Sequence, residues 1–176
     1  MIIGLSGYAR SGKDTVAGIL IGLHGYNSRA FANGVRELLL EVNPAISINE
    51  YGSRTLKDIV QTNGWEEAKK YKLVREYLQT LGLGARKVLG EETWINHAMS
   101  GISSSQQVVF TDVRFPNEAQ MIKNLYGQIW RIQRPGVVAV NNHPSESAMD
   151  SWKFDKIIMN NTGLDGLKQQ IASCLV

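Results

Sequence analysis

The sequence has few of the features that mark secreted, membrane-spanning or DNA-binding proteins. Its 176 residues include one cysteine, Cys174, so no disulfide can form within the chain, which favours a reducing, cytoplasmic setting. No apolar stretch reaches the roughly 18–20 residues that a membrane helix needs, and too few residues precede the first glycine-rich segment for a signal peptide. Lysines and arginines are scattered, with a net charge of only +3. We therefore expect neither a nucleic-acid nor a membrane partner, although the mild positive charge suits an anionic ligand.

The sequence does contain alternating strand and helix patterns, over a length typical of one domain. Hydrophobic residues make up 43% of the chain, enough for a core. The predicted strands are 2–6, 26–31, 107–111, 128–132 and 156–159. The predicted helices are 13–23, 35–42, 119–125 and 164–174, with further helical periodicity across about 48–101 and a loop at 135–147. This order predicts an α/β fold with a parallel sheet flanked by helices, and a ligand at the carboxyl ends of the strands.

A glycine-rich loop lies between the first predicted strand and the first predicted helix. Gly7 to Lys13 follows the pattern G-x-x-x-x-G-K, and this strand-loop-helix context makes the match specific. The backbone N–H groups of such a loop converge on phosphate oxygens, and the start of the helix adds partial positive charge. Lys13 would contact the β- and γ-phosphates and act in catalysis. The expected ATP-binding residues of this segment are Ala9, Arg10, Ser11, Gly12, Lys13, Asp14 and Thr15.

The residue after the loop lysine departs from the usual pattern. A serine or threonine hydroxyl commonly meets Mg²⁺ at this position, but here the residue is Asp14, and Thr15 comes next. An aspartate could bind the metal directly or through water. It could equally be a favourable charge at the start of a helix without any metal contact. The sequence does not distinguish these two interpretations. Asp14 and Thr15 are both candidate metal ligands.

A further acidic residue, Asp112, ends the most apolar predicted strand. It would lie at the carboxyl edge of the sheet, where an acid typically orients Mg²⁺ or its water. Alternatively, Asp112 could cap the helix that begins near Pro116. The phosphate loop favours the first interpretation, so Asp112 is predicted to be a catalytic and metal-orienting residue. Arg114, two residues later, is a candidate clamp for a phosphoryl group, although a lone arginine is more often a solvated surface residue.

Four segments together resemble a known family. They are Ser11-Gly12-Lys13-Asp14, then Arg75-Glu76-Tyr77-Leu78-Gln79 followed by Gly82 and Arg86, then Asp112-Val113-Arg114-Phe115-Pro116-Asn117-Glu118-Ala119, and finally His143-Pro144-Ser145-Glu146. Outside the loop no single segment is specific. In this combination and order, over nearly the whole chain, they resemble the phage deoxynucleoside monophosphate kinases, distant relatives of adenylate kinase.

The resemblance implies a fold, a reaction and a setting. The fold would be a single P-loop kinase domain, 1–176, with a helical acceptor-binding insert at about 33–100 and a short lid at about 131–150. The reaction would be transfer of the γ-phosphoryl group of ATP to a deoxynucleoside monophosphate with Mg²⁺. The setting would be the host cytoplasm if the chain is phage-encoded, and the family also suggests a homodimer.

The resemblance also carries over individual residues. The expected acceptor-binding residues are Arg36, Arg75, Gln79, Arg86, Arg114 and Arg134, and Arg36 stands where relatives commonly have lysine. The turn at 160–163 looks like the place where relatives hold the ATP base, which adds Asn161. Arg131 and Arg134 leave the strand before the lid, and they could close over phosphates or be exposed charges. For His143, a structural role in a loop is favoured over a catalytic role. The four tryptophans are interpreted as residues of the core or its rim and not as stacking platforms for a base.

The sequence is also compatible with two other functions. A kinase of the same architecture could use another acceptor, such as phosphomevalonate or dephospho-coenzyme A, because the Ser-Gly-Lys-Asp loop also occurs in the phosphomevalonate group. A nucleotide switch or a DNA-packaging accessory could bind ATP without any acceptor. Such a module would not need the set Arg36, Arg75, Gln79 and Arg86.

Overall fold

The chain folds into two compact units. The computed structural model describes residues 1–49, 52–103, 105–139 and 144–175. One unit contains Met1–Phe31 and Met99–Val176, and the other is Ala32–Ala98. The second unit is therefore an insertion within the first, and its bounds lie close to those of the predicted insert, 33–100.

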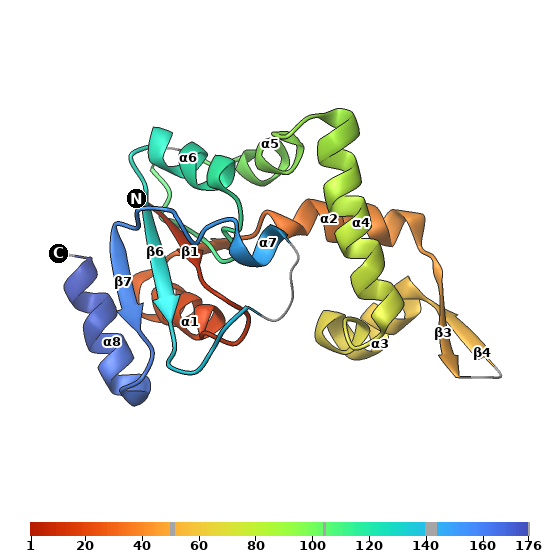
Figure 1. The fold of residues 1–176 in the computed structure, drawn as a ribbon, viewed down its shortest axis with the longest axis horizontal. Coiled ribbons are helices and arrows are strands. Elements are labelled where there is room, and N and C mark those ends of the chain that lie inside the picture. The colour runs from red at the N-terminus through yellow and green to blue at the C-terminus, as the bar shows by residue number, and fades with distance from the viewer. Residues whose placement is uncertain (50–51, 104, 140–143, 176) are drawn as a thin grey trace. The chain divides into compact units, whose positions relative to one another are not determined.

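A parallel sheet of five strands forms the centre of the first unit, in the order β2-β5-β1-β6-β7 (Figure 1). Every neighbouring pair is parallel. The strands are β1 (Ile2–Ser6), β2 (Asn27–Arg29), β5 (Val108–Phe110), β6 (Gln128–Gln133) and β7 (Lys156–Met159). Because all strands run in one direction, the loops that follow them meet at one edge of the sheet. The predicted α/β fold with a parallel sheet is confirmed.

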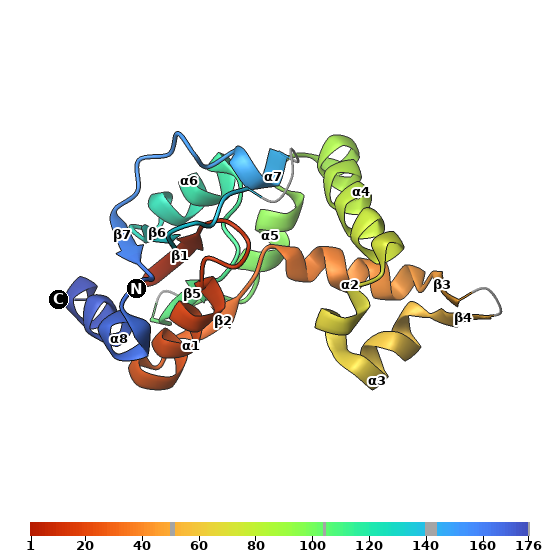
Figure 2. The ribbon, with the colours of Figure 1, turned by 60° about the horizontal axis from the view of Figure 1, so that its bottom comes forward.

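Alternation along β1 directs side chains to opposite faces of this sheet. Ile3 and Leu5 are fully buried in a core that they share with α1 (Lys13–His24) and α8 (Gly163–Cys174). Gly4 faces α6 (Pro116–Asn124), where an added Cβ would lie 2.7 Å from Cδ1 of Ile122. Figure 2 shows α1 and α8 on one side of the sheet and α6 on the other. Both faces are covered, as a parallel sheet requires.

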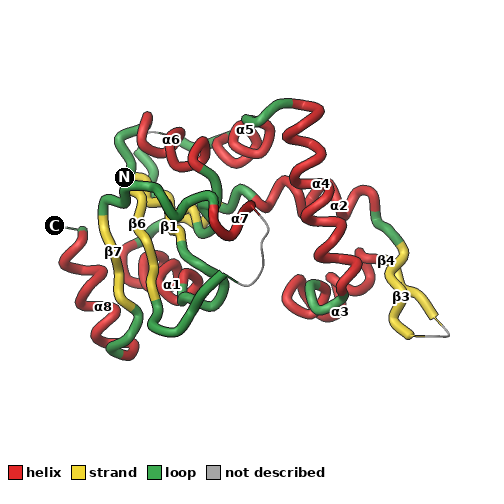
Figure 3. The backbone as a smooth tube through the Cα atoms, viewed as in Figure 1, coloured by secondary structure: helices red, strands yellow, loops and turns green. Residues whose placement is uncertain are grey.

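The second unit is mostly helical (Figure 3). It has a core of its own. It contains α2 (Ala32–Val42), α3 (Leu56–Ala68), α4 (Lys72–Leu89), α5 (Thr93–Met99) and an antiparallel hairpin of β3 (Ala45–Asn49) and β4 (Gly52–Thr55). One core cluster consists of Leu39, Ile46, Leu56, Ile59, Ala68 and Val74. A second consists of Val35, Ala85 and Trp94. Neither these helices nor any other in the described part of the chain is long and apolar enough to cross a membrane.

Two short elements differ from the sequence prediction. The hairpin β3–β4 lies in a stretch where the sequence predicts helices, and α7 (Pro144–Ser147) lies in the predicted loop 135–147. Exposed Ser47 and Ser53 pair across the hairpin. β3 alternates only over Ile46-Ser47-Ile48-Asn49, and β4 (Gly-Ser-Arg-Thr) has no apolar residue, so the pattern is too short for a half-buried strand to be recognised.

Candidate active site

The loop between β1 and α1 depends on two glycines. Gly7 and Gly12 have φ angles of 151° and 102°. A Cβ on Gly7 would lie 2.5 Å from the carbonyl oxygen of Ile132, and a Cβ on Gly12 would overlap the side-chain amide of Asn160. The end of β6 and the residue after β7 therefore press against the loop, and a side chain at either glycine would force it apart. Arg10, between them, has φ 66°, a backbone conformation that persists where the surrounding structure imposes it.

Lys13 is the first residue of α1, and its side chain folds back over this loop. Its Nζ donates to the carbonyl oxygens of Gly7, at 2.8 Å, and Tyr8, at 2.9 Å. An ammonium group carries a further N–H donor beyond those that these bonds use. The lysine is therefore held against the loop with hydrogen-bonding capacity left for an anion.

Charged groups of both signs surround Lys13. Burial lowers the pKa of Lys13, and the guanidinium of Arg114 lowers it further. The carboxylates of Asp14, Glu146 and Asp112 raise the pKa of Lys13 and so oppose that shift. These four residues come from α1, from the segment after β5 and from α7. The fold therefore gathers Lys13, Arg114 and Asp112, the residues predicted to act in catalysis, into one electrostatic neighbourhood.

Asp112 lies directly beyond β5, the strand that neighbours β1. Its Oδ1 accepts a hydrogen bond of 2.8 Å from the backbone N–H of Phe31. The start of α6 is capped by another residue: Oε2 of Glu118 accepts from the backbone N–H groups of Arg114, at 2.8 Å, and Phe115, at 3.0 Å. Glu118 thus supplies one cap at the start of α6, whereas Asp112 supports the backbone of Phe31.

Arg114 is engaged by the short helix α7. Its Nη1 donates to Oγ of Ser145 at 3.3 Å and to Oε1 of Glu146 at 3.2 Å. Both partners belong to the segment His143-Pro144-Ser145-Glu146, of which His143 lies outside the described residues. The predicted lid at about 131–150 therefore contributes direct partners of Arg114.

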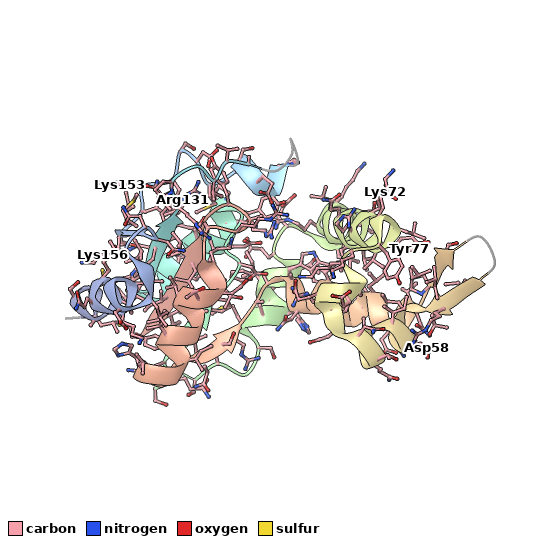
Figure 4. The ribbon with its side chains drawn as sticks, turned by 90° about the horizontal axis from the view of Figure 1, so that it is seen from below. Asp58, Lys72, Tyr77, Arg131, Lys153 and Lys156 are labelled. Carbon is pink, nitrogen blue, oxygen red and sulfur yellow. The ribbon has the colours of Figure 1, made fainter. Side chains whose placement is uncertain are left out.

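Arg131, labelled in Figure 4, is buried within β6 and pairs in register with Ser6, the last residue of β1. Its guanidinium carbon lies 4.6 Å from the ring centre of Tyr8 and 5.3 Å from that of Phe154. Its Nη2 donates to Oδ1 of Asp150 at 3.0 Å, and the Tyr8 hydroxyl donates to Oδ2 of the same carboxylate at 2.9 Å. That hydrogen bond to Asp150 raises the pKa of Tyr8. Arg131 therefore anchors the phosphate loop through an aromatic ring and an ion pair.

Asn160 holds the phosphate loop from the end of β7. Its Nδ2 donates to the carbonyl oxygen of Ser11 at 2.9 Å, whereas its neighbour Asn161 is exposed. The Oγ of Ser11 is buried and has no hydrogen-bond partner in the described part of the chain. A buried hydroxyl without a partner costs free energy, so this atom is poised for a polar ligand. The sequence prediction selected Asn161 from this turn and missed Asn160, whose position directly after the last strand was the available signal.

The first of the predicted acceptor residues, Arg36, lies on α2 in the second unit. It is half-buried, with its guanidinium carbon 5.8 Å from the ring centre of Trp65. Trp65 itself packs against the larger core cluster of this unit. Gln79 lies on the neighbouring helix α4 and is exposed. The structure thus offers a cation on an aromatic ring and an exposed amide within one unit.

Two other predicted acceptor residues, both on α4, already have protein partners. Nη1 of Arg75 donates to the carbonyl oxygens of Lys69, at 2.6 Å, and Lys70, at 2.8 Å, at the end of α3. Arg86 is buried, and its Nε donates to Oε2 of Glu91 at 3.1 Å. The sequence prediction did not anticipate either pairing: backbone carbonyl acceptors such as those of Arg75 leave no trace in a sequence, and Glu91 was not considered as a partner of Arg86.

The remaining predicted residues lie at or near the surface of the first unit. Arg10, Asp14, Thr15 and Arg134 are exposed, and Ala9 is half-buried in the loop. Within the described ranges, no group of three or more histidine, cysteine, aspartate or glutamate side chains could hold a metal ion by itself. A metal at this site would therefore need ligands from a bound substrate.

Comparison with known proteins adds one full-length relative. A protein of Acanthamoeba polyphaga mimivirus named "Putative deoxynucleotide monophosphate kinase" is 31% identical over 187 residues, which cover 99% of this chain and 96% of that protein. An uncharacterized protein of Ictalurid herpesvirus 1, ORF77, is 28% identical over 110 residues, or 57% of this chain and 47% of its own. A search against family models finds no match.

Solved structures are more distant. A shikimate kinase from Aquifex aeolicus matches with a TM-score of 0.48 and 12% identity, over 99% of this chain and 96% of that one. A dephospho-CoA kinase from Campylobacter jejuni matches with a TM-score of 0.42 and 17% identity, over 99% and 95%.

Proposed function

We propose, since this chain belongs to the same P-loop kinase family as the putative deoxynucleotide monophosphate kinase of mimivirus, that it transfers the γ-phosphoryl group of ATP to a deoxynucleoside 5′-monophosphate. The observation that carries the donor half of this proposal is the phosphate loop with Lys13 folded over it. The acceptor half rests on the name of that relative and on the side chains of the second unit. The relative comes from a giant virus, so a bacteriophage origin and a homodimer stay predictions of the family resemblance.

The donor half follows from groups that the loop holds ready. The phosphate oxygens of ATP would accept hydrogen bonds from the backbone N–H groups of the loop and of the start of α1. The unpartnered Oγ of Ser11 and the remaining donor of Lys13 would add hydrogen bonds to phosphate oxygens. Arg114 would stabilise the charge that develops on the transferring group. The exposed Asn161 is proposed to contact the ATP base.

Magnesium fits the donor set of this unit. Mg²⁺ is usually held by one or two carboxylates together with waters and substrate phosphates, and not by a protein cage. Asp112 and Asp14 supply such carboxylates, Thr15 follows Asp14 on α1, and all three belong to the unit that carries the phosphate loop. When bound with ATP, the ion would neutralise charge on the β- and γ-phosphates. We propose Asp112 as the residue that orients it.

For the acceptor half, we propose that the second unit binds the monophosphate. Arg75 and Gln79 are four residues apart on α4, so they share a face of this helix. An arginine can grip a phosphate with two parallel hydrogen bonds, and a glutamine can read the edge of a base as both donor and acceptor. Arg36 and Arg86 complete the proposed set in this unit, and Arg114 and Arg134 of the first unit stay acceptor-binding residues that the family resemblance predicts. Phosphomevalonate presents no base edge for Gln79 to read, whereas dephospho-coenzyme A carries an adenine base, so Gln79 discriminates only against the first of these two alternatives.

Arg75→Ala is expected to raise the Michaelis constant for a deoxynucleoside monophosphate at least about tenfold, with that for ATP nearly unchanged. Gln79→Ala should alter the ranking of dGMP, dTMP and dCMP more than it alters ATP use. The matched control is Lys72→Ala, because Lys72 is an exposed cation of the same helix whose ion pair with Glu76, at 3.5 Å, is solvated (Figure 4). Steady-state kinetics with each substrate varied in turn measures all three.

The bonds from Arg75 to the end of α3 supply a second way in which this variant could lose activity. Melting temperatures of the three variants separate the two effects, because weakening α3 lowers stability whether or not substrate binds there. Equal losses toward ATP and acceptor, or no loss at all, would remove this helix from the acceptor site.

A further inference from the structure

The carboxylate of Glu146 is the feature of the first unit that the proposed reaction does not use. Its side chain is 12% exposed, and its Oε1 accepts from Nη1 of Arg114 at 3.2 Å. Its second oxygen, Oε2, is buried and has no hydrogen-bond partner in the described part of the chain. The same carboxylate acts electrostatically on Lys13.

An anionic side chain in this place is unfavourable for a phosphate site taken alone. A carboxylate repels the phosphates that Lys13 and Arg114 attract, and a buried oxygen without a donor adds a desolvation cost. The packing of a short helix such as α7 does not require either penalty. Glu146 therefore has to contribute something to the site that offsets them.

The contribution is visible in the guanidinium of Arg114. Arg114 is 43% exposed, so its long side chain would sample many rotamers if nothing held it. Oε1 of Glu146 and Oγ of Ser145 both bind Nη1, which fixes one corner of the planar fork. A guanidinium has further N–H donors in a fixed geometry, so fixing one nitrogen orients the others.

We propose that Glu146 is a positioning residue for phosphoryl transfer, which holds Arg114 in the orientation that stabilises the transferring group, with Ser145 as the second support. The proposal rests on the proposed function in that it assigns Arg114 to the transferring phosphoryl. Preorganised charge is worth more than mobile charge because it costs no reorganisation during the reaction. The spare oxygen of Glu146 remains able to accept a hydrogen bond from an O–H group that arrives with the substrates.

A double-mutant cycle tests this assignment. Glu146→Ala is expected to lower kcat about tenfold or more in the wild-type background and less than about threefold in the Arg114→Ala background, because the effect passes through Arg114. Glu146→Gln keeps a carbonyl oxygen toward Nη1 and should restore part of the loss. Asp165→Ala is the matched control, since Asp165 is an exposed acid of the same unit in a surface pair with Lys168.

Three results would overturn the proposal: equal losses from Glu146→Ala in both backgrounds, an unchanged kcat, or a loss that follows the melting temperature and that Glu146→Gln does not relieve. The cycle is run with whichever acceptor the wild-type enzyme phosphorylates. If no deoxynucleoside monophosphate is phosphorylated, the proposed acceptor is wrong, and the cycle still reports on Glu146 through release of ADP with another acceptor or with water.

Discussion

Replacing Lys13 with alanine should lower turnover by at least about a hundredfold and leave the fold intact. Loss of one preorganised contact to a transferring phosphoryl group costs about 3–4 kcal/mol of transition-state stabilisation. The structure strengthens the expectation, because Nζ of Lys13 is already fixed by the carbonyl oxygens of Gly7 and Tyr8. Burial lowers the pKa of Lys13, which means that its environment disfavours the charge, and this offsets part of the stability lost with its two hydrogen bonds to the loop.

The measurement is a coupled assay of ADP release at saturating substrates, with the melting temperature as a check on folding. Lys153→Ala is the control, since Lys153 is an exposed lysine of the same unit (Figure 4). A folded Lys13→Ala protein that keeps more than about a tenth of wild-type turnover would contradict the assignment of the phosphate loop.

Asp112→Asn should lower turnover by about a hundredfold at low Mg²⁺, and raised Mg²⁺ should restore part of it. The substitution removes the charge but keeps an oxygen that can accept the bond from the Phe31 N–H, which is 2.8 Å long in the native protein. The fold at the end of β5 should therefore survive. The Mg²⁺ dependence of ATP binding, measured by calorimetry, gives a readout that does not depend on turnover.

Near-normal turnover of Asp112→Asn at low Mg²⁺ would assign Asp112 to the support of the Phe31 backbone alone. Glu118 accepts from the N–H groups of Arg114 and Phe115, so the start of α6 keeps this cap when Asp112 is replaced. Full activity of Asp112→Asn with only a small shift in melting temperature would therefore contradict the metal-orienting role.

The sheet and the phosphate loop could be predicted from the sequence because their signals are local. β1 matches the predicted strand at both ends, and the pattern from Gly7 to Lys13 carries its own backbone requirements. Trp94 and Trp130 are buried, as expected for core residues. By contrast, the hairpin β3–β4 has a period of two over only four residues of β3, and its formation depends on the packing of Ile46 into the second unit's core.

The support of the site could not be predicted, because it depends on contacts between distant segments. Asn160 reaches Ser11 across 149 positions, and Tyr8 reaches Asp150 across 142. Such pairs follow from the parallel sheet, which brings the ends of β1, β6 and β7 together, and not from any local pattern. For the same reason the partners of Arg114, which lie 31 and 32 positions further along the chain, became visible only in the folded chain.

Phosphoryl transfer from ATP to a deoxynucleoside monophosphate is tested most directly by measuring ADP release by the wild-type enzyme over a panel of acceptors with ATP and Mg²⁺. The panel contains dGMP, dTMP, dCMP, phosphomevalonate and dephospho-coenzyme A, with a reaction lacking any acceptor as the blank. We predict that ADP release depends on a deoxynucleoside monophosphate and that the corresponding diphosphate forms in equal amount. Release that depends only on phosphomevalonate or dephospho-coenzyme A, or that proceeds equally well without an acceptor, would contradict it.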